Sequence, residues 1–237
     1  MADPLTKTRG HYGSLQEPEE PGGGVLADDA GRRRGRPAGT CTVSRVCCCT
    51  RQTSMSTLRP FRATDLFKFN NINLDVWTET YGIAFYLSYL ARWPDLCCVQ
   101  EAPTGRMMGY VIGKAEGSAS DFHGHVTAIT VAPEYRRLSL GRKMMDLLER
   151  VSDEAYNGFF VDLYVRCANE IAIGMYEGLG YSVYRRVREY YGSLGLGPGG
   201  KDEEDAFDMR KPLSRDPMRR TVRANGRDMI VSAHDVS

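Results

Sequence analysis

The sequence predicts one α/β domain of three layers, in which helices cover both faces of a mixed β-sheet. Two observations carry this prediction. Between residues 55 and 212, short apolar runs rich in β-branched residues alternate with runs whose apolar residues recur at three- and four-residue steps. The resulting order, β-α-α-β-β-β-α-β-α-β, interleaves helices with strands, which is typical of a three-layer α-β-α architecture.

The first elements are a short strand and two helices. We expect the strand over residues 58–62 and a short helix over residues 65–69, with Thr64 as its N-cap. Apolar and aromatic side chains recur through residues 79–93, which predicts a longer helix. Pro94 ends this helix, because proline lacks the N–H that a helix interior needs.

The rest of the domain begins with a hairpin. Residues 97–102 and 107–114 flank Pro103-Thr104-Gly105-Arg106, a turn sequence that joins antiparallel strands. The later elements follow in order: a strand over residues 123–131, a helix over 140–156, a strand over 159–165, a helix over 169–179 that ends at Gly180, and a strand over 182–191.

The segments outside the domain differ in composition. Residues 1–54 are rich in Gly, Pro, Arg and Ser, so we expect them to be disordered, and residues 213–237 are expected to form a disordered basic tail. Arg34-Gly35-Arg36-Pro37 resembles the core of an AT-hook, but a four-residue match in an arginine-rich segment is weak, and DNA binding is not expected. Met55 could be the physiological start, so whether residues 1–54 belong to the protein in the cell stays open.

Composition argues against several classes of protein. The 31 Lys and Arg residues against 30 Asp and Glu give a net charge of +1, so no global field favours nucleic acid or a membrane surface. We expect neither a transmembrane segment nor a signal peptide. Seven cysteines without a Cys-x-x-Cys pair indicate reduced thiols. A cytoplasmic protein is therefore expected, with presence in the nucleus left open.

A basic turn between residues 131 and 141 is the strongest candidate for a binding site. It connects the strand that ends at Val131 to the helix that begins at Leu140. The first N–H groups of a helix have no partner within it and point in one direction, so such a turn can hold a phosphate group. Four cationic side chains surround it: Arg136, Arg137, Arg142 and Lys143. The turn therefore has the features of a diphosphate site.

Two motifs resemble the GCN5-related N-acetyltransferase (GNAT) family. The basic turn matches the family's (Arg or Gln)-x-x-Gly-x-(Gly or Ala) signature at Arg136 and Gly141, with Ser139 in place of the first glycine. Serine tolerates positive φ poorly but caps helices well, so Ser139 is expected to be the N-cap of the following helix. The second motif, Asn-x-x-Ala-x-x-x-Tyr-x-x-x-Gly-Tyr, begins at Asn169 and includes Tyr176.

The resemblance implies the family's fold over residues 55–212 and binding of acetyl-coenzyme A. Tyr176 would be the catalytic acid beside the thioester sulfur, although a core role for its ring stays open. Asn169 would hold the pantetheine arm, and backbone N–H groups near Ile129 to Val131 would polarise the carbonyl. The implied cofactor-binding residues are Ile129, Val131, Arg136, Arg137, Ser139, Leu140, Gly141, Arg142, Asn169 and Tyr176.

Shorter segments narrow the resemblance to the catalytic subunits of NatB-type N-terminal acetyltransferases within this family. These segments are residues 69–75, 78–82, 123–128, 189–191 and 208–211. The resemblance implies acetylation of nascent chains that begin Met-Asp, Met-Glu, Met-Asn or Met-Gln. It also implies a heterodimer with a large helical-repeat auxiliary subunit, on or near the ribosome. The implied substrate-binding residues are Glu79, Tyr81, His125, Thr127, Tyr190 and Tyr191.

The histidines of the strand over residues 123–131 are candidates for recognising the side chain of the second residue of the substrate. His125 can donate a hydrogen bond to a carboxylate or an amide oxygen, and Thr127 lies on the same strand face. His123 shares that face, but no third ligand stands at a useful spacing, so no metal site is expected. Tyr190 and Tyr191 could simply pack across strands, but adjacent strand residues point to opposite faces, so one of the two is expected to point away from the core.

Two other functions stay open on the sequence alone. One is an acetyltransferase of the same fold that acts on another amine, such as a Met-Leu terminus or a lysine side chain. The other is a noncatalytic interaction protein in which Ser139 blocks the cofactor site and the N-terminal Arg34-Gly35-Arg36-Pro37 binds DNA.

Overall fold

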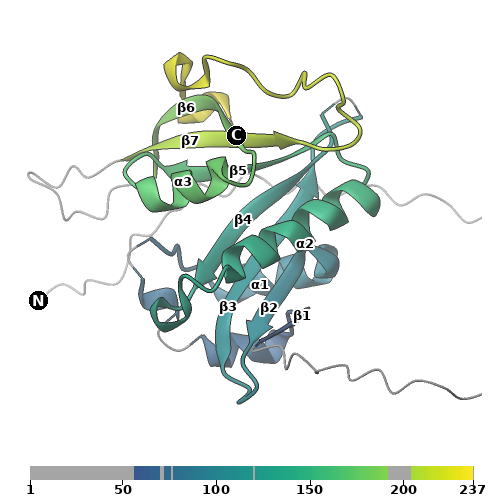
Figure 1. Cartoon of the computed structure of the whole chain (residues 1–237), viewed down its shortest axis with the longest axis vertical. Helices are drawn as coiled ribbons and strands as arrows, with labels where there is room; N and C mark the ends of the chain where they lie inside the picture. Colours follow the sequence, from purple (N-terminus) through teal and green to yellow (C-terminus); the bar gives the residue numbers. More distant parts are fainter. Residues whose placement is uncertain (1–55, 70–71, 76, 120, 192–203, 237) are drawn as a thin grey trace, which may run out of the picture. The chain divides into compact units, whose positions relative to one another are not determined.

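The computed structural model describes residues 56–236, apart from residues 70–71, 76, 120 and 192–203. Eight strands form one sheet in the order β1-β2-β3-β4-β5-β7-β6-β8 (Figure 1). Only the β4–β5 and β6–β8 neighbours are parallel, so the predicted mixed sheet is confirmed. The strands are β1 (Thr57–Pro60), β2 (Cys97–Glu101), β3 (Met107–Glu116), β4 (His123–Val131), β5 (Phe160–Arg166), β6 (Ser182–Tyr191), β7 (Glu204–Pro212) and β8 (Ile230–Ser232).

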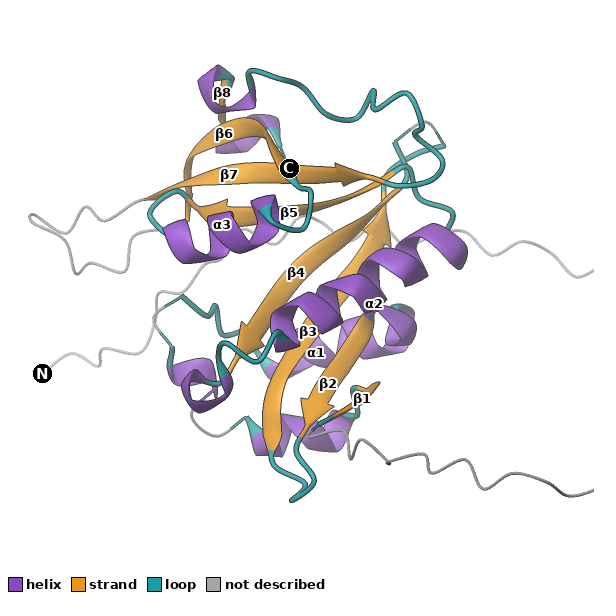
Figure 2. Ribbon diagram, viewed as in Figure 1, coloured by secondary structure: helices purple, strands orange, loops and turns teal. Residues whose placement is uncertain are grey.

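Helices cover both faces of this sheet. The α-helices are α1 (Ile83–Arg92), α2 (Leu140–Glu154) and α3 (Glu170–Glu177). Figure 2 shows α2 and α3 on one face and α1 on the other. Short 3-10 helices are η1 (Ala63–Lys68), η2 (Ile72–Leu74), η3 (Pro94–Leu96), η4 (Pro133–Tyr135), η6 (Gly226–Asp228) and η7 (Ala233–Asp235). Among the described residues, no helix is both long and apolar enough to span a membrane.

Alternation along the strands sends side chains into two cores. Cys97 and Val99 of β2 are buried in one core with Tyr86 of α1, whereas Cys98 is buried in the other with Met144 of α2. Successive strand residues point to opposite faces, so one strand contributes to both cores. Burial of one large apolar side chain contributes about 1.5–3 kcal/mol, so the strands are held firmly between α1 and α2.

Two predicted features in the first half of the domain are wrong. Thr64 is not an N-cap, because η1 begins at Ala63 and the N–H of Arg62 donates to the Asp65 carboxylate at 2.9 Å. The helix expected over residues 79–93 begins only at Ile83. Glu79 lies before it in irregular backbone, and its carboxylate pairs with Arg166 of β5 at 2.6 Å. This tertiary contact outweighs the helical periodicity.

The structure adds two strands that are absent from the predicted order. In β7, Asp208 is fully buried and pairs with Arg185 at 2.8 Å. β8 lies beyond Pro212, where the composition predicts disorder, and pairs with β6. The guanidinium of Arg223 packs over the Tyr184 ring at 3.8 Å in the same region. Ion pairs and cation–π contacts thus help to hold this region, whereas the predicted order of strands was based on apolar patterns alone. The expectations for residues 1–54 lie outside the described residues.

Strands β4 and β5 separate along their length (Figure 2). Their backbones pair only between residues 124–126 and residues 161–163. The N–H of Ala132, just beyond β4, donates to the carbonyl of Met108 in β3 at 2.9 Å. Along a strand, successive N–H groups point to opposite sides, so those of Ile129 and Val131 point away from β3, toward the side where β5 has diverged.

Candidate active site

The turn between β4 and α2 holds two non-glycine residues in left-handed backbone. Arg137 has a φ of 65° and Ser139 a φ of 58°. Ser139 occupies the N-cap position of α2, as predicted, but its side chain makes no capping hydrogen bond. Serine therefore adopts a backbone conformation that favours glycine, and its hydroxyl does not fill the role expected of it.

The same turn carries uncompensated positive charge. Arg136 donates to the Val131 carbonyl at 3.2 Å and pairs with the carboxylate of Asp75, so its guanidinium anchors the turn. The backbone N–H groups of residues 137–142 meet no acceptor in the described part of the chain. Nor does any described carboxylate pair with the three remaining cations, which are Arg137, Arg142 and Lys143. Free N–H groups beside free cations fit a diphosphate.

Helix α3 lies against the start of α2. A Cβ atom at Gly141 would lie 3.3 Å from the Met175 sulfur, so a larger residue would crowd this junction. Asn169 is the N-cap of α3, and its side-chain oxygen accepts the N–H of Ala172 at 3.2 Å. The oxygen of Asn169 is thus used within the fold, and its amide NH2 is the group left to contact a ligand.

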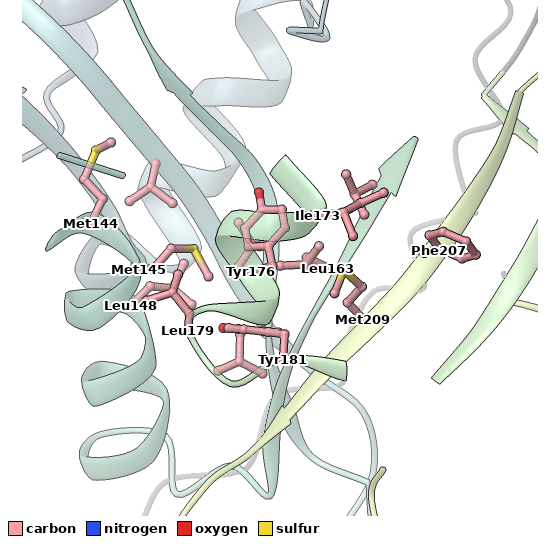
Figure 3. Packing of buried hydrophobic residues seen from close by; sticks show 14 of the residues in the cluster. Met144, Met145, Leu148, Leu163, Ile173, Tyr176, Leu179, Tyr181, Phe207 and Met209 are labelled. Atoms are coloured by element: carbon pink, nitrogen blue, oxygen red, sulfur yellow. The ribbon is translucent and has the colours of Figure 1, made fainter. Parts of the chain in front are cut away.

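Tyr176 lies on the buried face of α3. Its ring packs edge-on against Tyr181 with 5.9 Å between centroids, and its hydroxyl points away from Tyr181 (Figure 3). Burial is the one cause that raises the pKa of Tyr176, and no hydrogen bond from a described side chain contributes. The phenol is therefore protonated at neutral pH but is a weaker acid than a free tyrosine. The ring is part of the core, and the hydroxyl has no side-chain partner among the described residues.

A second group of side chains, the tyrosine cluster, consists of Tyr81, Phe85, Tyr164, Tyr190 and Tyr191. Tyr81 stacks on Phe85 at 4.1 Å, and Tyr190 stacks on Tyr164 at 4.4 Å. Burial raises the pKa of Tyr190, and the nearby hydroxyls of Tyr164 and Tyr81 add to this effect. The segment just before α1, the first turn of α1, strand β5 and the end of β6 are therefore close together.

A bulge at the end of β6 sets the direction of the two tyrosines. Glu189 has a φ of 51°, and its N–H donates to the Asp205 carboxylate at 3.0 Å. Tyr190 is 37% exposed, which agrees with the expectation that one of the two tyrosines points away from the core, and the two rings still contact each other with 5.1 Å between their centroids. The hydroxyl of Tyr191 donates to the carbonyl of Tyr164 at 3.0 Å, so it is held by the fold.

Glu79 joins the tyrosine cluster through an arginine. Its carboxylate pairs with Arg166 of β5 at 2.6 Å, and the same guanidinium pairs with Glu204 at 3.0 Å. The guanidinium also lies over the Tyr191 ring at 4.2 Å. Arg166 therefore connects the segment before α1 to β6 and β7.

His125 is held by a carboxylate from the neighbouring strand. Its Nδ1 lies 2.8 Å from Oδ1 of Asp162, and the two residues are only 9% and 4% exposed. An ionised carboxylate only accepts hydrogen bonds, so Nδ1–H of His125 donates to Asp162 and Nε2 is the ring nitrogen left for a ligand. The ring lies 5.8 Å from that of Tyr164 in the tyrosine cluster. Thr127 is less available, because its hydroxyl donates to Tyr89 at 3.2 Å.

Comparison with known proteins identifies this arrangement. Residues 66–181 match the model of the acetyltransferase (GNAT) family. The N-terminal acetyltransferase B complex catalytic subunit of Schizosaccharomyces pombe is 59% identical over 187 residues, which cover 77% of this chain and 99% of that protein. The chain belongs to the acetyltransferase (GNAT) family.

Solved structures of the same relatives are similar to this acetyltransferase. Naa20 of Chaetomium thermophilum, in complex with a bisubstrate analogue, matches with a TM-score of 0.72 and 44% identity over 76% of this chain and 99% of that one. A NatB acetyltransferase complex bound to a bisubstrate inhibitor matches with a TM-score of 0.66 and 38% identity over 76% and 99% of the two chains. The predicted fold and the resemblance to N-terminal acetyltransferase catalytic subunits are confirmed, so the chain is an enzyme.

Three residues of β5 that the sequence analysis missed contact the candidate site residues. Asp162 contacts His125, Tyr164 stacks on Tyr190, and Arg166 pairs with Glu79. The three stand at alternate positions, so they share one face of the strand, and apolar residues occupy the positions between them. That alternation of polar and aromatic residues was the signal that could have found them.

Charge around Asp162 keeps this carboxylate ionised. Burial by itself raises the pKa of Asp162, but the charge of His125 and its hydrogen bond, followed by His123 and Arg210, lower it below the usual range. His123 Nε2 lies 3.6 Å from the other carboxylate oxygen. Burial also raises the pKa of Tyr164, to about 12. Throughout the described residues, no three His, Cys, Asp or Glu side chains are arranged to hold a metal ion.

Proposed function

We propose that this acetyltransferase is the catalytic subunit of a NatB-type complex that acetylates protein N-termini beginning Met-Asp, Met-Glu, Met-Asn or Met-Gln. One observation carries the proposal: the buried His125–Asp162 pair lies beside the tyrosine cluster, and His125 belongs to β4, the strand that leads into the basic turn. Such a substrate requires a polar group that hydrogen-bonds its second side chain and aromatic side chains that line its binding cleft.

The basic turn would bind the donor. Acetyl-coenzyme A supplies an acetyl thioester when it is bound. The N–H groups of residues 137–142, with Arg137, Arg142 and Lys143, fit its diphosphate. The amide of Asn169 stands beyond this turn at the start of α3, as expected of a residue that holds the pantetheine arm.

Two groups of this chain would assist the transfer. The α-amine, whose usual pKa is about 8, is partly neutral at physiological pH and attacks the thioester carbonyl carbon. The N–H groups of Ile129 and Val131, on the open side of β4, would stabilise the oxyanion that forms. As the carbon–sulfur bond breaks, the proton that the amine nitrogen loses would pass to solvent, and the hydroxyl of Tyr176 would give its proton to the leaving thiolate and be reprotonated from solvent.

His125 would select the second residue. With Nδ1 bound to Asp162, a charged ring donates through Nε2 to the carboxylate of Asp or Glu, or to the amide oxygen of Asn or Gln. A neutral ring can only accept at Nε2, and among these side chains only an amide offers it a donor. Both ring states therefore accommodate Asn and Gln, and the charged state alone holds Asp and Glu.

The proposal includes a partner and a place of action. The NatB relatives are subunits of complexes, so we expect this chain to form a heterodimer with a large helical-repeat auxiliary subunit. Its substrates would be nascent polypeptides, met on or near the ribosome in the cytoplasm.

Acetyl transfer to a peptide panel tests the proposal. The chain, with and without the auxiliary subunit, is assayed on peptides beginning Met-Asp, Met-Asn, Met-Leu and Ser-Gly and on an internal-lysine peptide with a blocked N-terminus. We expect turnover of the first two alone. Turnover of Met-Leu or of the lysine peptide instead would favour an acetyltransferase for another amine.

A further inference from the structure

We propose that Ser139 is a phosphorylation site that switches acetyl-coenzyme A binding off. The inference rests on the proposed function, because it takes the start of α2 as the diphosphate site. Ser139 follows Arg136, Arg137 and Leu138 and precedes Leu140. Two guanidinium groups, three and two residues before a hydroxyl, form the charge pattern that protein kinases with acidic substrate clefts select.

The hydroxyl is accessible and makes no hydrogen bond, whereas a kinase that engages Arg136 must first break its contacts with Asp75 and the Val131 carbonyl. The turn from Arg136 to Ser139 is exposed, and the Ser139 side chain makes no capping hydrogen bond. Arg137 and Ser139 are both in left-handed backbone, with φ values of 65° and 58°. A non-glycine residue in this conformation is strained, so extension of the turn into a kinase cleft releases strain as it opens the local structure.

The modification is phosphoryl transfer from the ATP that the kinase binds. Ser139 Oγ attacks the γ-phosphorus, the bond between that phosphorus and the leaving ADP oxygen breaks, and the hydroxyl proton passes to the kinase's base. Phosphoserine carries a charge of about −1.5 to −2 at pH 7 and three acceptor oxygens. The negative charge therefore appears at the N-cap of α2, inside the same turn.

Phosphoserine and the donor's diphosphate would require the same groups. The N–H groups of residues 137–142 meet no acceptor in the described chain. Arg137, Arg142 and Lys143 pair with no described carboxylate. A covalently attached phosphate takes these donors at high effective concentration and repels a second anion. Because such coupling is reciprocal, bound acetyl-coenzyme A in turn shields Ser139 from the kinase.

The test uses the full-length chain in complex with its auxiliary subunit. The complex is treated with ATP and the catalytic subunit of cyclic-AMP-dependent protein kinase, an enzyme that selects this arginine pattern. Peptide mapping by mass spectrometry locates the phosphoryl group, and calorimetry measures acetyl-coenzyme A affinity before and after treatment. We expect phosphate on Ser139, about 100-fold weaker binding, slower labelling when acetyl-coenzyme A is in excess, and full recovery after phosphatase treatment.

Ser139→Gly is the matched control, because glycine suits the left-handed backbone and has no hydroxyl. This variant should bind acetyl-coenzyme A equally before and after kinase treatment. Three results overturn the proposal: no phosphate on Ser139, unchanged affinity of the phosphorylated complex, or a loss that phosphatase does not reverse. Failure of the untreated complex to bind acetyl-coenzyme A would instead contradict the proposed function.

Discussion

Replacement of Asp162 by asparagine tests how the enzyme selects the second residue. His125 Nδ1 and Asp162 Oδ1 are 2.8 Å apart and buried. Asparagine keeps the shape and an acceptor oxygen but removes the charge. Hydrogen bonds to charged groups contribute about 1.5–3 kcal/mol, roughly twice the value of neutral ones, so the variant weakens the hold on a charged His125 ring by about 1–1.5 kcal/mol.

This energy converts to about 5–10-fold lower kcat/KM for Met-Asp and Met-Glu peptides. Met-Asn and Met-Gln peptides should lose less, because the neutral His125 ring still accepts from their amide NH2. The assay measures kcat/KM of the complex on four peptides that differ only at the second position. The Met-Asp to Met-Asn ratio is the quantity that should fall.

Asp65→Asn is the matched control for this change. Asp65 is as buried as Asp162 and also pairs with a cation, Arg59, at 2.6 Å, but it belongs to η1 and contacts none of the site residues that the structure describes. Its replacement should leave the Met-Asp to Met-Asn ratio unchanged. The reasoning is refuted by an Asp162→Asn enzyme that folds, binds acetyl-coenzyme A normally and keeps the wild-type ratio.

Three further substitutions probe other parts of the site. Tyr176→Phe removes a hydroxyl that no described side chain hydrogen-bonds, so the unfolding temperature and the acetyl-coenzyme A affinity should not change while kcat falls by about 10²–10⁴-fold. An unchanged kcat would mean that the Tyr176 ring only fills the core. Ser139→Gly replaces a serine in left-handed backbone, so the free energy of unfolding in urea should rise by about 1–2 kcal/mol and calorimetry should show tighter acetyl-coenzyme A binding. A lower free energy of unfolding would contradict the inference that the backbone of Ser139 is strained. Asp205→Ala removes the acceptor for the Glu189 N–H, so peptide KM should rise about 5–10-fold at constant acetyl-coenzyme A affinity; equal changes in both would point to general unfolding.

Elements with a strong local pattern could be predicted from the sequence. The predicted bounds of β4 and β6 agree with the structure, because β-branched and aromatic residues recur within both strands. The start of α1 could not be predicted, since Glu79 is held by Arg166, 87 positions along the chain. β8 is only three residues long and depends on pairing with β6, so its two apolar residues do not reveal it.

The two halves of the site differ in the same way. The donor half lies within one turn and its flanking helix, so its residues are adjacent in sequence and could be predicted together. The acceptor half depends on contacts between strands. The partner of His125 is Asp162, 37 positions away, and the bulge that sets the direction of Tyr190 and Tyr191 needs Asp205. Such pairings follow from the register of the sheet, which local patterns do not encode.

Depletion of this enzyme from the cells that make it, followed by mass spectrometry of protein N-termini, tests the central claim most directly. The proposed function predicts that termini beginning Met-Asp, Met-Glu, Met-Asn and Met-Gln lose acetylation while Met-Leu and Ser termini keep it. Re-expression of the wild-type chain should restore acetylation of the first group. Unchanged acetylation of that group after depletion, or loss confined to other termini, would contradict the proposed function.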